Sequence, residues 1–327
     1  MRTGRILLTG AALVGVFVYL NNASWLAPEM SGKPVLLAHR GLAQTFSRDG
    51  LTNETCTASR IDPPRHAYLE NTIASIEAAF QAGADIVEFD VHPTTDGHFA
   101  VFHDWTADCR TEGRGVTREH TLAELKALDI GYGYTADGGT TFPFRGKGVG
   151  LMPSLDEVLT AFPERRLLIN VKSNDPKEGE LLGERLARLA PEKRRLLMAY
   201  DGDLPMVTLR TRVPDIAVMS RASLKGCAID YLALGWSGYV PKACEHTLLL
   251  VPQNYAWLLW GWPKRFLDRM RTAGTAVFLT GPYGSGDPGT SGVDDEARLK
   301  ALPERFDGGI WTNTIDLIGP IVRAAGG

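Results

Sequence analysis

The stretch of sequence that decides the fold is residues 70–104, ENTIASIEAAFQAGADIVEFDVHPTTDGHFAVFHD. It joins a helix-like segment to a short apolar strand that carries Glu88 and Asp90 two residues apart. Side chains at positions i and i+2 of a strand face the same side, so both carboxylates can point at one place. Carboxylate oxygens are the ligands that hard divalent cations prefer. The stretch therefore predicts a metal site carried by a strand.

Two histidines flank this carboxylate pair in the sequence. His103, followed by Asp104, ends the next extended run, and the upstream run VLLAHRG leads to His39 and Arg40. A lone histidine in such a place is more often structural, but two that bracket a carboxylate pair favour a functional role. Imidazole titrates near neutral pH and suits general acid and base catalysis. Together these residues predict a metal-assisted site for phosphate esters.

The order of the motifs resembles that of the glycerophosphodiester phosphodiesterase family. The motifs are His39-Arg40, Glu70-Asn71-Thr72, Glu88-Phe89-Asp90 and His103-Asp104, followed by Pro153 to Leu159, Val171-Lys172 and, more loosely, GGIWTN near the C-terminus. The likeness spans most of the chain after Lys33. It implies a (β/α)8 TIM barrel, and hydrolysis of glycerophosphodiesters to an alcohol and glycerol phosphate.

The resemblance also implies roles for single residues. His39 and His103 would be the acid and base pair, with the two roles not assigned between them. Glu88 and Asp90 would bind one divalent cation, Mg²⁺ or Ca²⁺, because all-oxygen ligation favours these ions over zinc. The remaining expected roles are phosphate binding for Arg40 and Lys172, and support of the site for Glu70 and Asp104. Glu70 ranks only as supporting because an acidic residue at a helix start is a routine dipole effect.

The chain departs from the family pattern at Asn170. The common pattern there is Glu-x-Lys, with the glutamate as a third metal carboxylate, whereas this chain has Asn170-Val171-Lys172. An amide oxygen can bind a hard cation but brings no charge. We expect Asn170 to be a neutral third ligand, so that the ion binds more weakly or another carboxylate substitutes. A second departure is Thr312-Asn313, where the family usually has Thr-Asp.

Short apolar runs alternate with helix-like segments such as Thr72–Ala82, Gly179–Leu189 and Pro263–Ala273, which predicts a parallel sheet. Eight candidate strands without a dinucleotide glycine fingerprint favour a (β/α)8 barrel over a doubly wound sheet. Leu248–Val251 is a further apolar run that could be a strand of its own. The expected strands are Val35–His39, Ile86–Val91, Leu167–Lys172, Leu196–Tyr200, Ile216–Ser220, Gly238–Val240, Ala276–Thr280 and Gly309–Thr312.

Three irregular stretches are predicted loop insertions on the catalytic face, because each follows a strand. They run from Leu42 to Leu69, from Gly131 to Leu151 and from Gly281 to Gly292. The third, rich in glycine, is expected to be a mobile loop. It lacks Gly-Lys-Ser/Thr, so a nucleotide P-loop is not expected.

The N-terminus is expected to lie outside the barrel. Arg2 and Arg5 precede the apolar run Ile6–Leu20, as in an export signal. We expect residues 1–27 to be a signal anchor or a cleaved signal peptide, 28–34 a linker, and 35–327 the barrel domain. An uncleaved anchor would hold the domain on the periplasmic side of the inner membrane, and cleavage would release it. A buried N-terminal helix is disfavoured because the run has no polar face.

Four cysteines support export, because an even count fits two disulfides in an oxidising compartment. Cys56 and Cys109 lie in segments expected to flank the site, and Cys227 and Cys244 are close in sequence. The sequence leaves the connectivity open, and four buried thiols are the alternative.

Charge and composition narrow the class of function. The chain of 327 residues has 35 basic and 38 acidic residues, which gives no basic footprint for nucleic acid. The expected partners are a glycerophosphodiester or lysophospholipid substrate and a membrane. The alternatives are a lysophospholipase D or sphingomyelinase D-like activity, and a phospholipid-binding protein that has lost turnover. Helix packing is the preferred explanation for the aromatic residues Trp257, Trp260, Trp262 and Phe266, ahead of an acyl-chain groove or bilayer contact.

Overall fold

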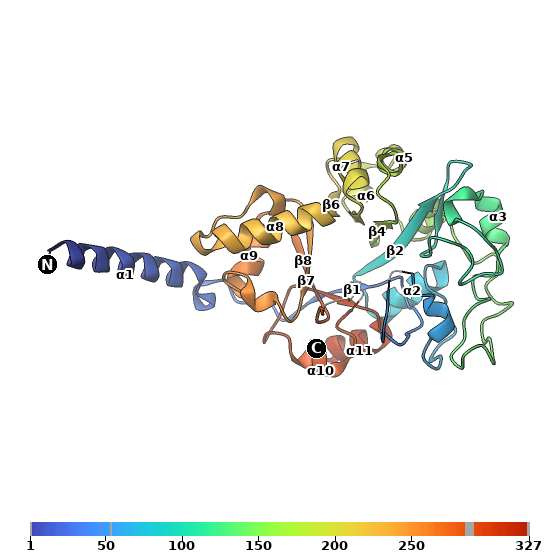
Figure 1. Cartoon of the computed structure of the whole chain (residues 1–327), viewed down its shortest axis with the longest axis horizontal. Helices are drawn as coiled ribbons and strands as arrows, with labels where there is room; N and C mark the ends of the chain where they lie inside the picture. The colour runs from blue at the N-terminus through green and yellow to red at the C-terminus, as the bar shows by residue number, and fades with distance from the viewer. Residues whose placement is uncertain (1, 53, 285–290, 326–327) are drawn as a thin grey trace.

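Eight parallel strands form a nearly closed barrel with helices around it (Figure 1). The computed structural model describes residues 2–52, 54–284 and 291–325. The strands pair in the order β6-β5-β4-β2-β1-β9-β8-β7, and β3 pairs antiparallel with β2 at its far end. Their bounds are β1 Val35–Ala38, β2 Ile86–Pro93, β3 Phe99–Val101, β4 Arg166–Val171, β5 Leu197–Asp201, β6 Ala217–Ser220, β7 Leu248–Pro252, β8 Ala276–Thr280 and β9 Gly309–Thr312.

Helices connect most of the parallel strands. The helix of the opening stretch, α2, starts at the capping residue Thr72, whose side chain accepts from Ser75 N, and it ends at the left-handed Gly83. The bounds are α1 Arg2–Asn22, α2 Ile73–Ala82, α3 Leu122–Ala127, α4 Leu155–Ala161, α5 Pro176–Ala187, α6 Pro191–Arg194, α7 Asp203–Arg212, α8 Arg221–Leu234, α9 Lys264–Thr272, α10 Glu296–Lys300 and α11 Ile315–Ala325.

The core has two layers because successive strand residues face opposite sides. Leu37, Ile86 and Leu168 belong to the cluster inside the barrel. Their neighbours Val87 and Leu167 belong to the larger cluster between the strands and the helices. Burial of both strand faces explains why the strands read as continuous apolar runs.

The barrel prediction is confirmed, and the position of one strand is wrong. Gly238–Val240 forms no strand, because Gly238 has a φ of 87° at the end of a turn and because Pro241 comes directly after Val240. The place in the barrel is taken by Leu248–Pro252, the run noted as a possible strand of its own. β6 and β7 stand at the two ends of the strand order, where the Thr247 hydroxyl donates to Val218 O at 2.7 Å.

The first two predicted insertions pack against each other in a side lobe beside β3. Thr135 N donates to Ala58 O, and Ile61 N donates to Thr135 O. The four cysteines form two disulfides, as predicted, and Cys56–Cys109 joins the first insertion to the segment that follows β3. Residues 285–290 of the third insertion lie outside the described residues. The lobe has its own apolar core, made of Ala58, Ile61, Leu69, Ala100, Phe102, Leu125, Ile130, Tyr134, Phe144 and Met152.

Helix α1 extends away from the barrel beside the end formed by α8 and α9 (Figure 1). Arg269 of α9 fixes its C-terminal end by donating to Asn21 O at 2.8 Å and to Asn22 Oδ1 at 3.0 Å. Within the described ranges, no helix is both long enough and apolar enough to cross a bilayer. The predicted signal anchor therefore has no support from the structure.

Candidate active site

The predicted site residues converge at the carboxyl ends of β1, β2 and β4, three neighbouring strands. Asp90 of β2 and Asn170 of β4 are register partners. Glu88 lies two residues before Asp90 on the same side of β2, and both carboxylates are fully buried. His39 and Arg40 directly follow β1. The catalytic face of the barrel thus brings both predicted metal carboxylates next to the first predicted histidine.

Protein donors hold each carboxylate in place. Arg40 N donates to Glu88 Oε2 at 3.0 Å, and the Tyr200 hydroxyl donates to Glu88 Oε1 at 2.9 Å. Asn71 Nδ2 donates to Asp90 Oδ2 at 2.9 Å, while Asn71 Oδ1 accepts from Asp90 N at 3.1 Å. Both carboxyl groups are therefore fixed by their neighbours.

Asn170 lies where the third ligand was predicted. Its Nδ2 donates to the Tyr200 hydroxyl at 2.9 Å, which fixes the orientation of the amide. The buried Oδ1 atoms of Asn170 and of Asp90 accept no hydrogen bond, although Lys172 Nζ lies 3.4 Å from Asp90 Oδ1. Unpartnered buried oxygens are costly unless a cation or water satisfies them. This donor set fits one hard divalent cation.

The set contains two carboxylates and an amide. Over the part of the chain that the structure describes, no group of three His, Cys, Asp or Glu side chains is placed to hold a metal ion. A cation here would therefore depend on Asn170 as its third protein ligand. The substituting carboxylate considered from the sequence has no counterpart among the described residues.

The two carboxylates titrate in opposite directions. Burial, together with the negative charge of Asp90, raises the pKa of Glu88 to about 8. Burial alone would also raise the pKa of Asp90, but Lys172, His103 and Arg40 lower it below its usual range. A divalent cation between them would favour the ionised form of both groups.

His39 is a neutral imidazole whose tautomer is set by Asn313. Its Nδ1 lies 2.6 Å from Asn313 Oδ1, an atom that can only accept, so Nδ1 carries the proton. Asp294 Oδ2 in turn accepts from Asn313 Nδ2 at 2.8 Å, which fixes the amide. Burial, and then the charge of Arg40, lowers the pKa of His39 to about 3. The unprotonated Nε2 lies 3.8 Å from Glu88 Oε2 and faces the site.

His103 has a carboxylate partner instead of an amide. Its Nδ1 lies 2.7 Å from Asp104 Oδ1, and Arg110 Nη1 donates to both oxygens of Asp104 at 3.0 and 2.8 Å. Burial, and then Arg40 and Lys172, lowers the pKa of His103 to about 4. The expectation that His103 ends a barrel strand is wrong. His103 follows β3, which pairs antiparallel with β2.

The predicted phosphate-binding cations are engaged in ion pairs. Arg40 Nη1 lies 3.0 Å from Glu70 Oε1, and Arg40 Nε lies 3.4 Å from Asp90 Oδ2. Glu70 also accepts from Arg110 Nη2 at 3.0 Å. Glu70 precedes the capping residue Thr72 and is buried between two arginines, so its role is to hold Arg40 rather than to complement the helix dipole.

Two non-glycine residues of the site have left-handed backbones. Arg40 has a φ of 58° and Asn71 a φ of 61°, and Asn71 N donates to Arg40 O at 3.0 Å. Such conformations are uncommon for side chains other than glycine and gather at functional sites. These backbone conformations direct the backbone N–H of Arg40 at Glu88 and the side-chain amide of Asn71 at Asp90.

Four residues of this network had no role from the sequence. Asn71 stands inside the Glu-Asn-Thr motif, and a polar side chain after the apolar run of β5 was the signal for Tyr200. Arg110 and Asp294 have no local signal in the sequence. The partners of Arg110, Asp104 and Glu70, lie 6 and 40 residues away from it, and Asn313 lies 19 residues after Asp294.

Cavities flank the two histidines. One of about 190 Å³ is lined by His39, Arg40, Gln44 and Arg298, among other residues. Another of about 260 Å³ is lined by His103, Asp104, Trp105 and the Cys56–Cys109 disulfide, among other residues. The site thus has open space beside each of the two histidines.

The family model for the glycerophosphoryl diester phosphodiesterase family matches residues 39–260. The chain belongs to this family, and the resemblance seen in the motifs is confirmed. A glycerophosphodiester phosphodiesterase of Caldanaerobacter subterraneus is 38% identical over 103 residues, which is 32% of this chain and 39% of that protein. One of Bacillus subtilis is 39% identical over 114 residues, covering 34% of this chain and 38% of that protein. The matched region thus spans about two fifths of these relatives.

Solved structures share the fold over nearly the whole barrel. A glycerophosphodiester phosphodiesterase from Agrobacterium tumefaciens superimposes with a TM-score of 0.57 at 22% identity, covering 89% of this chain and 99% of that one. A phosphodiesterase from Oleispira antarctica, solved with the product sn-glycerol-3-phosphate, has a TM-score of 0.56 at 20% identity, covering 90% and 96%.

Proposed function

We propose that this protein hydrolyses glycerophosphodiesters to an alcohol and glycerol phosphate. The observation that carries the proposal is the pair of histidines, one held by Asn313 and one by Asp104, beside the unpartnered oxygens of Asp90 and Asn170. The relatives named above as glycerophosphodiester phosphodiesterases support the substrate class.

In this proposal His39 is the general base and His103 the general acid. Asn313 keeps the proton of His39 on Nδ1, so that Nε2 can take a proton from the water molecule that attacks the phosphorus. Burial lowers the pKa of His103, but the hydrogen bond to the Asp104 carboxylate opposes this and would stabilise the protonated ring, which could then give a proton to the leaving alcohol. The different partners of the two rings are the reason for this assignment.

Glu88, Asp90 and Asn170 would hold one Mg²⁺ or Ca²⁺ ion. When bound, the ion would supply charge stabilisation to the phosphoryl oxygens. Arg40 and Lys172 would bind the remaining non-bridging oxygens, both being already held near Asp90.

The test is release of glycerol phosphate from a panel of glycerophosphodiesters by the purified full chain. Activity should disappear on treatment with a chelator and return when Mg²⁺ or Ca²⁺ is added back. Turnover that survives exhaustive chelation would refute the dependence of the activity on a metal ion. Binding without turnover would instead support the alternative of a phospholipid-binding protein.

We further propose that the domain works outside the cytoplasm, on the periplasmic side. The two disulfides and the basic, then apolar, N-terminal sequence support this location.

A further inference from the structure

The Cys56–Cys109 disulfide forms part of the wall of the candidate site. Both cysteines line the cavity of about 260 Å³ that His103 and Asp104 also line. Cys56 lies in the first insertion, and Cys109 lies in a turn between β3 and the short helix Thr117–Glu119. Neither cysteine belongs to a strand or a helix. Loops vary more in position than strands do, so a covalent bond between these two segments fixes where the wall stands.

The residues that directly follow the two cysteines, Thr57 and Arg110, bond each other. Arg110 Nη2 donates to Thr57 Oγ1 at 2.8 Å. Arg110 Nη1 lies 3.9 Å from Cys109 Sγ and donates to both oxygens of Asp104 at 3.0 and 2.8 Å. The disulfide thus holds the backbone beside Arg110, and the residue after Cys56 holds the end of its side chain.

The Asp104 carboxylate connects Arg110 to His103. An ionised carboxylate can only accept, so Asp104 Oδ1 accepts from His103 Nδ1 at 2.7 Å. Over the ranges that the structure describes, Arg110 is the only arginine within ion-pair distance of Asp104. Glu70, the other acidic partner of Arg110, also pairs with Arg40. A displaced Arg110 would therefore act mainly on Asp104 and, through it, on the ring of His103.

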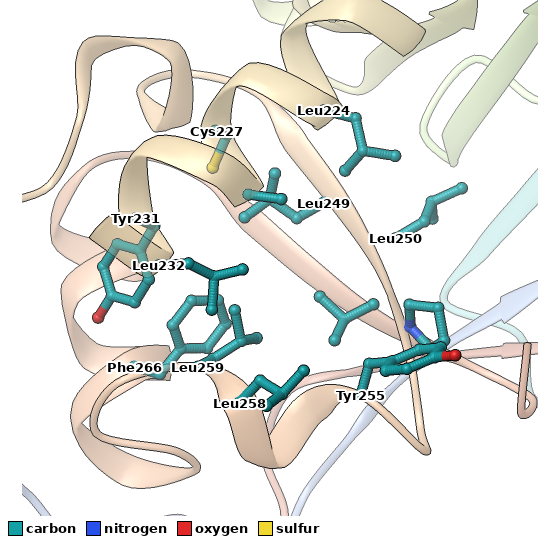
Figure 2. Close-up of a pocket in the computed structure, with 13 residues that line it drawn as sticks. Leu224, Cys227, Tyr231, Leu232, Leu249, Leu250, Tyr255, Leu258, Leu259 and Phe266 are labelled. Atoms are coloured by element: carbon teal, nitrogen blue, oxygen red, sulfur yellow. The ribbon is translucent and has the colours of Figure 1, made fainter. Parts of the chain in front are cut away.

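The second disulfide, Cys227–Cys244, has no such connection. Cys227 lines an apolar groove between α8, β7 and the segment that follows β7, together with Leu224 and Leu249 (Figure 2). Among the described residues, none of those proposed for the site lines this groove. Cys227 and Cys244 are both buried. The second disulfide is therefore a matched control for the first.

We propose that the Cys56–Cys109 disulfide positions His103: it holds Arg110 where Arg110 fixes Asp104, and Asp104 orients the imidazole. The inference rests on the proposed function, in which His103 gives a proton to the leaving alcohol. Loss of the disulfide should impair this proton transfer and leave the rest of the reaction nearly intact. An alkoxide needs the proton in order to leave, whereas 4-nitrophenolate is a weak base and leaves without it.

The experiment measures kcat and KM of the full chain for glycerophosphocholine and for glycerol 4-nitrophenyl phosphate. In Cys56→Ser/Cys109→Ser, kcat for glycerophosphocholine should fall about tenfold or more, because a displaced acid loses part of the ~10²-fold that a positioned acid contributes. For the nitrophenyl ester, kcat should change less than about twofold, because its leaving group needs no acid. KM should change little for either ester. His103→Ala should show the same selectivity, and Cys227→Ser/Cys244→Ser should keep the parental kcat for both esters.

Equal losses on the two esters would show that the bond serves stability alone and would overturn the inference. Parental kcat for both esters in Cys56→Ser/Cys109→Ser would overturn it as well.

If that double variant does not fold, dithiothreitol replaces it as the means of opening the bond in the folded parent. It gives two electrons to the disulfide, which becomes two thiols, and is itself oxidised to a cyclic disulfide. Cys56 and Cys109 are half-buried beside a cavity and should react before the buried Cys227–Cys244 pair. Protein reduced at Cys56–Cys109, as mass spectrometry of alkylated thiols identifies it, should show the same selective loss. Parental kcat for glycerophosphocholine in that protein would refute the positioning role.

A parent that hydrolyses neither ester would refute the proposed function, and the orientation of His103 would then be measured by NMR of ¹⁵N-labelled histidine. The Nδ1–H resonance of His103 should move in Cys56→Ser/Cys109→Ser and stay in place in Cys227→Ser/Cys244→Ser. An unmoved resonance in the first variant would show that the disulfide does not position His103.

Discussion

Asp90 and Asn170 are register partners on β2 and β4, and each has a buried Oδ1 atom that accepts no hydrogen bond. Tyr200 produces this arrangement at Asn170, because its hydroxyl accepts from Asn170 Nδ2 while donating to Glu88. The amide oxygen is thereby available beside a carboxylate oxygen. One residue on a third strand, β5, thus orients two of the three proposed ligands.

The charge of the residue at position 170 should set the metal requirement. Because affinity for a hard cation rises with ligand charge, Asn170→Asp and Asn170→Glu should need less metal for half-maximal activity than the parent. Asn170→Leu should need more, or should fail to bind. Metal titrations of activity, with binding followed separately by calorimetry, measure this. Three variants that titrate like the parent would remove Asn170 from the ligand set.

His39→Ala and His103→Ala should each lower kcat by ~10²-fold or more, because a positioned acid or base contributes at least that much. Their melting temperatures should stay close to that of the parent. His120→Ala is the control, since His120 follows the short helix Thr117–Glu119, outside the candidate site, and its Nε2 lies 3.0 Å from the backbone oxygen of Arg114. Near-normal turnover by either site variant would refute its role.

Asn313→Leu tests the orientation of His39. Without the Asn313 oxygen, Nδ1 loses its acceptor and the imidazole can rotate or change tautomer. We expect kcat to fall at least tenfold, as typically happens when a supporting hydrogen bond is removed, with little change in KM. Asn313→Asp should recover part of the loss because it keeps an acceptor. Asn174→Leu, at an exposed asparagine after β4, is the control. Equal kcat in all three variants would contradict the orientation.

The sequence predicted those parts of the fold and site that depend on local pattern. Glu88 and Asp90 could be placed on one side of a strand because side chains alternate with a period of two. Helix α2 could be predicted because its capping residue and its final glycine are adjacent to it in sequence. The strand at Gly238–Val240 was misplaced because three apolar residues before a proline resemble a short strand. The partners Arg110 and Asp294 were missed because tertiary packing alone brings them to the site. Tyr200 was missed because its only signal is one polar group in an apolar strand.

Arg110→Met should destabilise the fold strongly. Arg110 is buried and pairs with Asp104 and Glu70, so its loss leaves the Asp104 carboxylate without its arginine and Glu70 with Arg40 alone. Breaking a buried pair costs about 3 to 5 kcal/mol. Arg114→Met is the matched control, because the Arg114 side chain is 83% exposed in its pair with Asp108 and should cost less than ~1 kcal/mol. Urea unfolding measures both variants, and equal midpoints would show that the buried network adds no stability.

The two disulfides should contribute unequally to stability. Cys56–Cys109 closes a loop of 53 residues and Cys227–Cys244 one of 17, so the loss of chain entropy in the unfolded state predicts about 4 and about 3 kcal/mol. The Cys56→Ser/Cys109→Ser and Cys227→Ser/Cys244→Ser double variants, unfolded in urea, measure these values.

In cell fractions, thiol labelling before and after reduction should find all four cysteines oxidised and the protein outside the cytoplasm. Four reduced cysteines in a cytosolic fraction would overturn both the oxidising compartment and the proposed location.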